Sequence, residues 1–142
     1  MITVRDFMTE NPVTVTAETP MIDVIQKLIG CKHQYLPVLQ DGRLVGLISE
    51  RDLKFALSSL YQYPNPPADV WAEKPAAQFM IPHPLTVSPE DTVYLVAELL
   101  SIYNVGALPV LENDNVVGIV TITGLLKFLA SKNSLTGIEL LD

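Results

Sequence analysis

Short segments in which apolar and polar residues alternate occur near the start of each half of the chain. The triplets Val13–Val15 and Leu85–Val87 each place one polar residue between two apolar ones, the pattern of a half-buried strand. A helical pattern follows each triplet. Residues 24–29 place their apolar side chains on one face, whereas residues 95–100 are apolar around more of the helix. The second helix is therefore either more deeply buried or faces a partner.

Two further apolar segments predict a β-hairpin in each half. Tyr35–Leu39 and Arg43–Ile48 are joined through Asp41-Gly42, a dipeptide typical of a type I′ turn, and the second half has Asn113-Asp114 there. A last helix is expected over about residues 51–60 in the first half and about 124–130 in the second. Each half therefore predicts the order β-α-β-β-α.

The first residues of the two central helices suggest N-caps. Thr19 precedes Pro20, and proline is favoured at the first helical position. Asp91 occupies the equivalent place in the second half and is an equally good cap by residue type. We therefore expect Thr19 and Asp91 to bind the first N–H groups of these helices.

The two halves are also copies of each other. With an offset of 72 residues, Val4–Leu57 aligns with Ala76–Leu129 without a gap, and 16 of the 54 positions are identical. Two copies are fewer than a solenoid needs, so we expect two similar units that cover each other's apolar faces. The predicted boundaries are residues 1–60 for the first repeat, 61–75 for a proline-rich linker, 76–132 for the second repeat and 133–142 for a C-terminal tail.

The linker region contains aromatic side chains, namely Trp71, Tyr61 and Tyr63. One interpretation is that they attach the linker to the rest of the domain, and this one is favoured. The other is that they cover a ligand cleft or form a dimer contact.

Composition narrows the class of protein. A chain of 142 residues with 49% hydrophobic and 18% charged residues suits one domain or two very small ones and excludes a multi-domain enzyme. No apolar run reaches the roughly 18 residues that a membrane span needs, and the first residues lack a signal-peptide pattern. The single Cys31 cannot form an internal disulfide. We therefore expect a cytoplasmic protein with no membrane insertion.

The charge distribution narrows the class of partner. A net charge of −7 argues against nucleic acid or an anionic membrane as the partner. Residues 1–57 are nearly balanced, so a small anion is expected to bind the first half. His33 and His83 lack metal-ligand spacing, and no phosphate loop or nucleophile motif occurs, so we predict no metal site and no catalytic residues.

The candidate chemistry lies in Gly46–Leu53, which Gly118–Leu125 matches in the second half. The glycine allows close approach to the backbone, Ser49 follows at the strand-to-helix turn, and Asp52 comes three residues later. One interpretation is a capping box, with Ser49 as N-cap and Asp52 at N3. The other is a nucleotide site in which the helix start binds a phosphate and the carboxylate binds both ribose hydroxyls. Spacing alone favours the cap, and the two interpretations are compatible.

These motifs, twice and in this order, resemble the CBS domain, named after cystathionine β-synthase, and the pair resembles a Bateman module. The matching motifs are Phe7-Met8 with Pro12 and Thr14-Val15, Leu36-Pro37-Val38 with Leu108-Pro109-Val110, and the closing segment Gly46–Leu53. The resemblance implies an α/β fold of the α+β kind, with two β-α-β-β-α repeats related by a pseudo-twofold axis and packed through small sheets. It also implies clefts between the repeats, a homodimer, and a regulatory protein that is not an enzyme.

The resemblance further implies a ligand and the residues that bind it. The expected ligand is AMP, ADP or ATP, with S-adenosylmethionine as a further candidate. Asp52 is expected to hold the ribose hydroxyls, with Ser49 and Arg51 near the ribose and phosphates. Further expected contacts from the two repeats are Thr14, Val15, Tyr35, Leu36, Pro37, Ala107, Pro109, Thr121 and Thr123. Because Gly124 replaces the aspartate in the second repeat, we expect one competent site and a second that is weak, altered or empty.

The sequence therefore predicts a regulatory module that senses an adenine nucleotide between its repeats and signals to a partner protein. The alternative is a ligand-free interaction or scaffolding module that acts through dimerisation. In that alternative, Ser49 and Asp52 only cap a helix.

Overall fold

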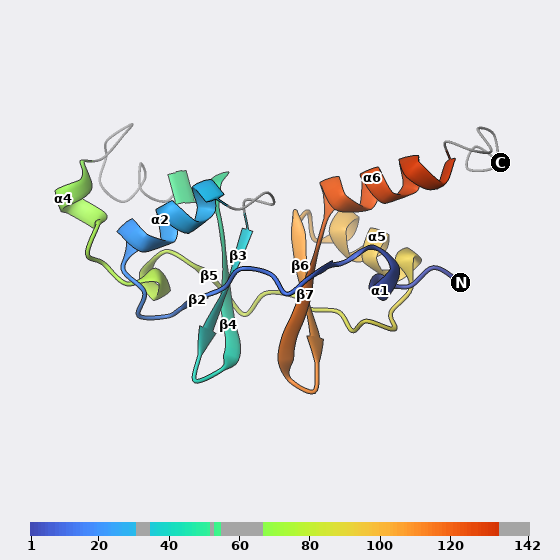
Figure 1. Ribbon diagram of the computed structural model, residues 1–142, viewed down its shortest axis with the longest axis horizontal. Helices are drawn as coiled ribbons and strands as arrows, with labels where there is room; N and C mark the ends of the chain where they lie inside the picture. The colour runs from blue at the N-terminus through green and yellow to red at the C-terminus, as the bar shows by residue number, and fades with distance from the viewer. Residues whose placement is uncertain (31–34, 52, 55–66, 134–142) are drawn as a thin grey trace. The chain divides into compact units, whose positions relative to one another are not determined.

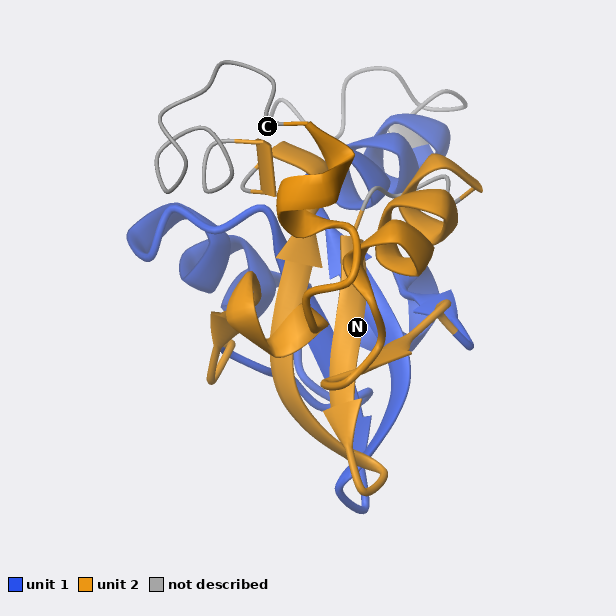
Figure 2. Cartoon of the chain, turned by 90° about the vertical axis from the view of Figure 1, so that its left-hand side faces the viewer, with its two compact units in different colours: residues 1–11, 85–142 blue, residues 12–84 orange. Residues whose placement is uncertain are grey.

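Two compact units make up the computed structural model, which describes residues 1–30, 35–51, 53–54 and 67–133 (Figure 1). Unit 1 combines residues 1–11 with residues 85–142, and unit 2 comprises residues 12–84 (Figure 2). The first residues of each sequence repeat thus belong to the unit built mainly from the other repeat. In the described part of the chain, no helix is long and apolar enough to cross a membrane.

Unit 2 is built around a four-stranded sheet. The strands are, in order across the sheet, β2 (Val15–Thr16), β3 (Tyr35–Gln40), β4 (Arg43–Ser49) and β5 (Ile81–Pro82). β2 runs parallel to β3, and the other neighbours are antiparallel. The helical elements are α2 (Met21–Gly30), α4 (Ala68–Trp71) and the 3-10 turn η1 (Ala76–Gln78). Val24 and Leu28 on one face of α2 pack with Leu36 and Ile48 of the sheet in the core.

Unit 1 has the same plan with three named strands. Their order is β1 (Thr9–Glu10), β7 (Asn115–Thr121) and β6 (Ala107–Glu112), all antiparallel. The helices are α1 (Val4–Phe7), α5 (Val93–Ile102) and α6 (Ile122–Asn133). Val96 and Leu100 of α5 pack with Leu108 and Val120 of the sheet. The mixed α+β class predicted from the sequence is therefore confirmed.

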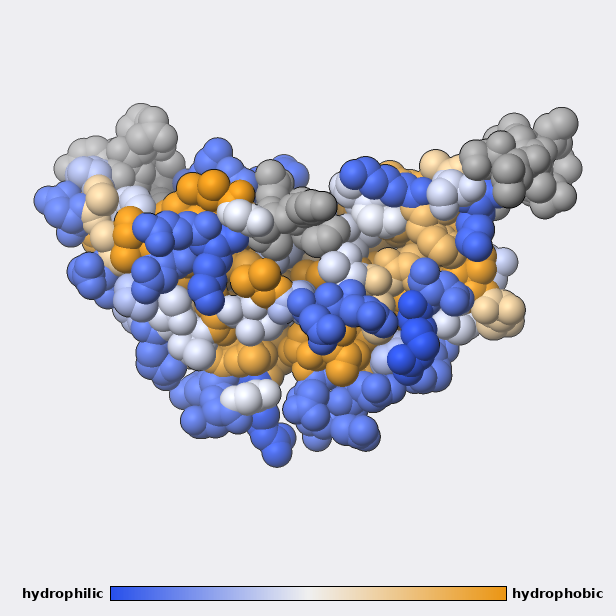
Figure 3. All heavy atoms as spheres, viewed as in Figure 1, coloured by the Kyte–Doolittle hydropathy of each residue, from blue (hydrophilic) through white to orange (hydrophobic). Residues whose placement is uncertain are grey.

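Both predicted hairpins are confirmed. Asp41 and Gly42 have φ of 52° and 79°, and Asn113 and Asp114 have φ of 53° and 64°. Two successive residues in the left-handed region are what a type I′ turn requires, and asparagine, aspartate and glycine tolerate it best. Hydrophilic residues cover both turns (Figure 3).

The other elements differ from the prediction in length. The first predicted strand begins only at Val15, and its counterpart in the second half is a single bridge between Val87 and Val110. The last helix is longer than expected, because α6 starts at Ile122 and ends at Asn133. Most of the helix predicted over 51–60 lies outside the described residues, as do Cys31, His33, Tyr61 and Tyr63.

The predicted N-caps are wrong. The Thr19 hydroxyl accepts the Thr16 N–H at 2.9 Å, and the Asp91 carboxylate accepts the Ser88 N–H at 2.7 Å, so both side chains close the turn before the helix. The cap of α5 is Thr92, whose hydroxyl accepts the Leu95 N–H at 3.2 Å. The predicted cap of α5 was one residue too early. The side chains of Thr19 and Asp91 bind the backbone N–H of the residue three positions before them, which such short polar side chains can do in place of capping a helix.

Carbonyl groups from a distant segment bind the helix starts instead. The Met21 and Ile22 N–H groups of α2 donate to the Lys74 and Ala72 carbonyls at 2.8 and 2.9 Å. In unit 1 the Val93 N–H of α5 donates to the Ile2 carbonyl at 3.1 Å. These bonds satisfy N–H groups that a helix start otherwise leaves without an intrahelical acceptor.

Trp71 belongs to the segment that supplies those carbonyls. It is half-buried and packs against the core of unit 2. This contact supports the interpretation that the linker is attached to the domain through its aromatic side chain.

The glycine shared by the two repeats lies beneath a methionine. A Cβ on Gly118 would lie 2.7 Å from Met8 Sδ and 3.0 Å from the Thr9 carbonyl, and a Cβ on Gly46 would lie 2.8 Å from Met80 Cγ. The methionine of each Phe-Met pair therefore packs on the glycine of the other sequence repeat, within one compact unit. The close backbone approach predicted at these glycines is made by a thioether side chain.

We expect Gly118→Ala to lower the free energy of unfolding by about 1–3 kcal/mol, because the new methyl group must displace Met8 and the Thr9 backbone. Gly30→Ala is the matched control, since no atom lies within 4 Å of the place that its Cβ would take, and it should be neutral or slightly stabilising. Urea unfolding of the three proteins measures both effects. Equal stability of Gly118→Ala and the wild type would contradict this packing.

Candidate functional site

The predicted ligand residues of unit 2 gather at one end of its sheet. The strand register pairs Tyr35, the first residue of β3, with Ser49, the last residue of β4. β2 enters beside β3 in the same direction, with Val15 opposite Val38. β3 starts at the end where β4 finishes, so Leu36 and Pro37 lie one and two residues from this end. β2 begins farther along, opposite Val38, and Thr14 directly precedes it.

Burial divides these residues into two groups. Val15 and Leu36 are 3% and 0% exposed and belong to the core, and Pro37 is fully buried as well. Thr14 and Tyr35 are half-buried, so their side chains remain accessible to a bound molecule. Of the residues expected to line an adenine pocket, Val15, Leu36 and Pro37 are therefore core residues, and only Thr14 and Tyr35 are partly accessible at this end of the sheet.

The polar residues follow directly on β4. Ser49 is 6% exposed, and Glu50 and Arg51 are already helical. Arg51 is exposed, which leaves its guanidinium accessible to an anion. Asp52 lies outside the described residues. A buried hydroxyl and an exposed cation at the start of a helix form the polar part of the candidate site.

The second repeat uses the equivalent position as a helix cap. The Gly124 N–H donates to Thr121 Oγ1 at 2.9 Å, and the Ile122 N–H donates to the Gly106 carbonyl at 3.1 Å. Thr121 is 6% exposed, like Ser49. Thr121 thus caps α6, and two of the first N–H groups of that helix have acceptors. The capping box predicted for Ser49 and Asp52 involves a residue outside the described ones and stays a prediction.

The contact of Gly124 with the cap favours a small residue at this position. A Cβ at this position would lie 3.0 Å from Thr121 Oγ1, so any larger residue would crowd the capping hydroxyl. The other predicted residues of this repeat differ in exposure: Ala107 and Pro109 are buried, whereas Thr123 is exposed on α6. Unit 1 therefore presents a hydroxyl at this place but no carboxylate.

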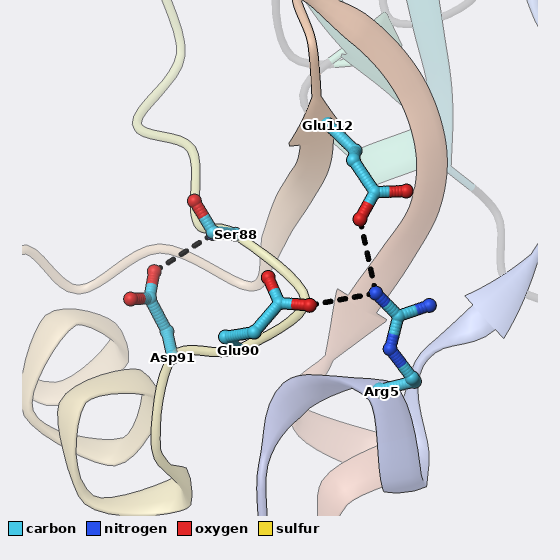
Figure 4. Close-up of polar contacts among 5 residues, drawn as sticks. All are labelled: Arg5, Ser88, Glu90, Asp91 and Glu112. Atoms are coloured by element: carbon cyan, nitrogen blue, oxygen red, sulfur yellow. Dashed lines mark hydrogen bonds and ion pairs between the residues drawn. The ribbon is translucent and has the colours of Figure 1, made fainter.

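The side chains with shifted pKa values lie elsewhere in unit 1. One nitrogen of the Arg5 guanidinium contacts Glu90 Oε1 at 2.7 Å and Glu112 Oε2 at 3.0 Å (Figure 4). The hydrogen bond from Arg5 lowers the pKa of Glu90, and the two carboxylates raise the pKa of Arg5. We name these three residues the Arg5 clasp.

Sequence reasoning missed the Arg5 clasp. The residue aligned with Arg5 in the other repeat is Ala77, so the repeat pattern gave no signal for it. The usable signal was the concentration of acidic residues in the second half, which a cation from the first half partly neutralises. Across the described ranges, no three His, Cys, Asp or Glu side chains are grouped as metal ligands would be.

Comparison with known proteins identifies both repeats. The family model of the CBS domain matches residues 4–59 and 76–131. A CBS domain-containing protein of Dictyostelium discoideum is 30% identical over 134 residues, covering 90% of this chain and 91% of the relative. Other relatives are much longer: the chain spans 23% of a homoserine O-acetyltransferase and 22% of an inosine-5′-monophosphate dehydrogenase.

Solved structures show the same fold with bound adenosine compounds. The CBS domain pair of protein MJ0100, in complex with 5-methylthioadenosine and S-adenosyl-L-methionine, has a TM-score of 0.76 and 26% identity over 93% of this chain and 98% of its own. CBSX2, in complex with AMP, has a TM-score of 0.74 and 27% identity over 94% and 99%. With both repeats matched by the family model and the fold shared with solved pairs, the chain belongs to the CBS domain family.

Proposed function

We propose that this protein is a regulatory module that binds an adenine nucleotide at the end of the unit 2 sheet and reports its presence to a partner protein. The observation that carries the proposal is the difference between equivalent positions. Arg51 and Asp52 follow Ser49, whereas the equivalent positions after Thr121 are Thr123 and Gly124, which carry no charge. Similar CBS domain pairs in complex with AMP or with S-adenosyl-L-methionine support a ligand of this class.

Each polar residue has a distinct role in the proposal. The Asp52 carboxylate accepts hydrogen bonds from both ribose hydroxyls, as carboxylates do in dinucleotide folds. The Arg51 guanidinium is exposed and pairs with phosphate oxygens. Ser49 adds a hydroxyl at the helix start, and Tyr35, its partner across the strands, supplies a ring for the base. AMP, ADP and ATP share these features, and S-adenosylmethionine shares the adenosine part.

The second repeat is not proposed as an equal site. Without a carboxylate at Gly124 the two ribose hydroxyls lack their acceptor in the second repeat. Thr123 is exposed and able to form only a peripheral contact. One nucleotide per chain is therefore the proposed stoichiometry.

The role of the ligand is regulatory in this proposal, and the protein is not an enzyme. A bound nucleotide shifts a conformational equilibrium only by its difference in affinity for the two states. A partner that recognises one of those states then senses nucleotide concentration. Longer relatives that are named as enzymes carry a region similar to this chain as a minor part of their length, which fits a regulatory role.

We also propose that two copies associate through the helices of unit 1. Four apolar side chains of high exposure lie on or next to these helices, namely Tyr94 (75%), Ile102 (63%), Tyr103 (57%) and Leu126 (60%). Only one of the ten residues of α5, Glu98, is charged. Each chain carries a net charge of −7, so two copies repel each other through most of their surface. The repulsion is weakest where charged residues are sparse, as on α5, and we therefore propose that a second copy binds at these helices. This exposed apolar face also favours the alternative, a scaffolding module.

Nucleotide binding is tested by thermal unfolding with AMP, ADP, ATP and S-adenosylmethionine, with GMP as the negative control. A ligand at about a hundred times its dissociation constant should stabilise the wild type by about 2.7 kcal/mol. Asp52→Asn should weaken binding at least about tenfold, which corresponds to roughly 1.4 kcal/mol. Asp69→Asn, an exposed aspartate of α4, is the matched control and should bind like the wild type. No shift with any adenosine compound would favour the scaffolding module.

The dimer face is tested by light scattering. Ile102→Glu and Leu126→Glu should each raise the dimer dissociation constant at least about tenfold, because a charge replaces an exposed apolar side chain that the proposed dimer buries. Ile29→Glu alters an isoleucine of α2 that is 80% exposed and should leave the dimer unchanged. A wild-type monomer at high micromolar concentration, or an equal effect of all three variants, would contradict the proposal.

A further inference from the structure

The first residues of the chain dock on unit 1 as a peptide docks on a receptor. The Val4 N–H donates to the Asp91 carbonyl at 2.8 Å and the Arg5 N–H to the Pro89 carbonyl at 2.9 Å. Thr9 and Glu10 then add a short strand to β7, opposite Ile119 and Gly118. Added strands and backbone bonds of this kind are a common mode of peptide recognition.

Apolar anchors secure the same segment. Val4 is fully buried and belongs to the core of unit 1, and Phe7 and Met8 pack against that core. The Phe7 ring lies 5.6 Å from the Phe128 ring of α6, centroid to centroid. Met8 fills the space above Gly118. Backbone bonds, a buried valine and two packed apolar side chains therefore hold residues 2–11 on the rest of unit 1.

The Arg5 clasp adds charge specificity to this docking. Arg5 comes from the segment, whereas Glu90 and Glu112 belong to the receiving part of unit 1 (Figure 4). The three side chains are 42–71% exposed, so their attraction is screened by solvent and salt. The Arg5 clasp therefore contributes specificity for a cation at position 5, and it supplies only a small part of the free energy of docking.

The segment is joined to unit 2 at one point. Unit 1 ends its first stretch at Asn11 and unit 2 begins at Pro12. Asn11 has φ of 48°, in the left-handed region, and its N–H donates the last hydrogen bond of the segment, to the Val117 carbonyl at 3.2 Å. A change of backbone angles at this junction would separate the segment from the rest of unit 1, whose core then needs an equivalent segment.

We propose that the docking surface of unit 1 accepts residues 2–11 of a second copy of this chain, so that two chains exchange these segments. The identical segment of a second copy offers every contact described above, and reciprocal exchange closes a symmetric dimer. The inference does not depend on nucleotide binding or on the helix faces of α5 and α6.

Release of the segment is expected to depend on pH through the Arg5 clasp. The titratable groups that face or flank Arg5 are the carboxylates of Glu90, Glu112, Asp6 and Asp91. Because the pKa of folded Glu90 is lowered, its contribution is present above the ordinary glutamate pKa and is lost as the pH falls through the lowered value. The stability difference between the wild type and Arg5→Gln should shrink below about pH 4 and in 1 M salt. A difference that stays constant would contradict an ionic contribution.

Charge reversal tests the exchange directly. Arg5→Glu places like charges together within one chain, and so does the double variant Glu90→Arg with Glu112→Arg. In a mixed pair with exchanged segments, both clasps again join opposite charges. The two variants are unfolded together, refolded, and analysed by native mass spectrometry.

If the two variants pair at random, half of all dimers contain one chain of each variant. Dimers that associate only through the helices of unit 1 would show this random share. Exchange predicts that mixed dimers rise well above half. The matched control reverses the pair Lys54–Glu50, which lies within one helix and cannot be restored by exchange, using Lys54→Glu with Glu50→Lys. If the single variants fail to fold, folding of the mixture as mixed dimers supports the proposal. The proposal would be overturned if mixed dimers made up only the random share or the same share as in the control. It would also be overturned if the mixture stayed unfolded under conditions in which the wild type refolds.

Discussion

Reciprocal backbone hydrogen bonding between the start of one repeat and the first helix turn of the other determines this fold. The Met21 N–H binds the Lys74 carbonyl, and 72 residues later the Val93 N–H binds the Ile2 carbonyl. The return bonds follow the same offset, from the Ala76 N–H to Thr19 and from the Val4 N–H to Asp91. Since each set satisfies backbone groups that would otherwise lack partners near a core, neither unit is complete without a segment from elsewhere in the chain.

This exchange explains why three distant motifs recur together. The Phe-Met pair of one repeat must fill the space over the glycine of the other, so both have to be retained at the same offset. The glycine in turn precedes the end of β4 or β7 by three residues, where Ser49 or Thr121 begins the next helix. The methionine therefore packs three residues away from the strand end at which Ser49 or Thr121 lies.

Local features were predictable from the sequence, and contacts between distant segments were not. The two turns formed as expected because Asp41-Gly42 and Asn113-Asp114 determine their own backbone angles. The caps at Thr19 and Asp91 were wrong because these side chains accept N–H groups of the preceding turns, and because α5 is capped one residue later, by Thr92. The sequence could not show that the first residues of each repeat dock on the other repeat. The offset between the repeats is the same whether a segment docks on its own repeat or on the other. For the candidate site, the contrast between Asp52 and Gly124 was readable, and the cap at Thr121 followed from spacing; the burial of Leu36 and Pro37 beneath the surface did not.

The two repeats share a backbone plan but differ in the charges that they add to it. Arg5 has Ala77 as its equivalent, so the ion pairs that hold the segment docked on unit 1 cannot have a counterpart at Ala77. Asp52 has Gly124 as its equivalent, so the second repeat lacks a carboxylate at this sequence position. A duplicated fold satisfies its packing with the residues that both copies keep, which leaves the remaining positions free to diverge. The divergent charges therefore place the ion pairs of the docked segment in unit 1, and they are the reason why we propose ligand recognition for unit 2.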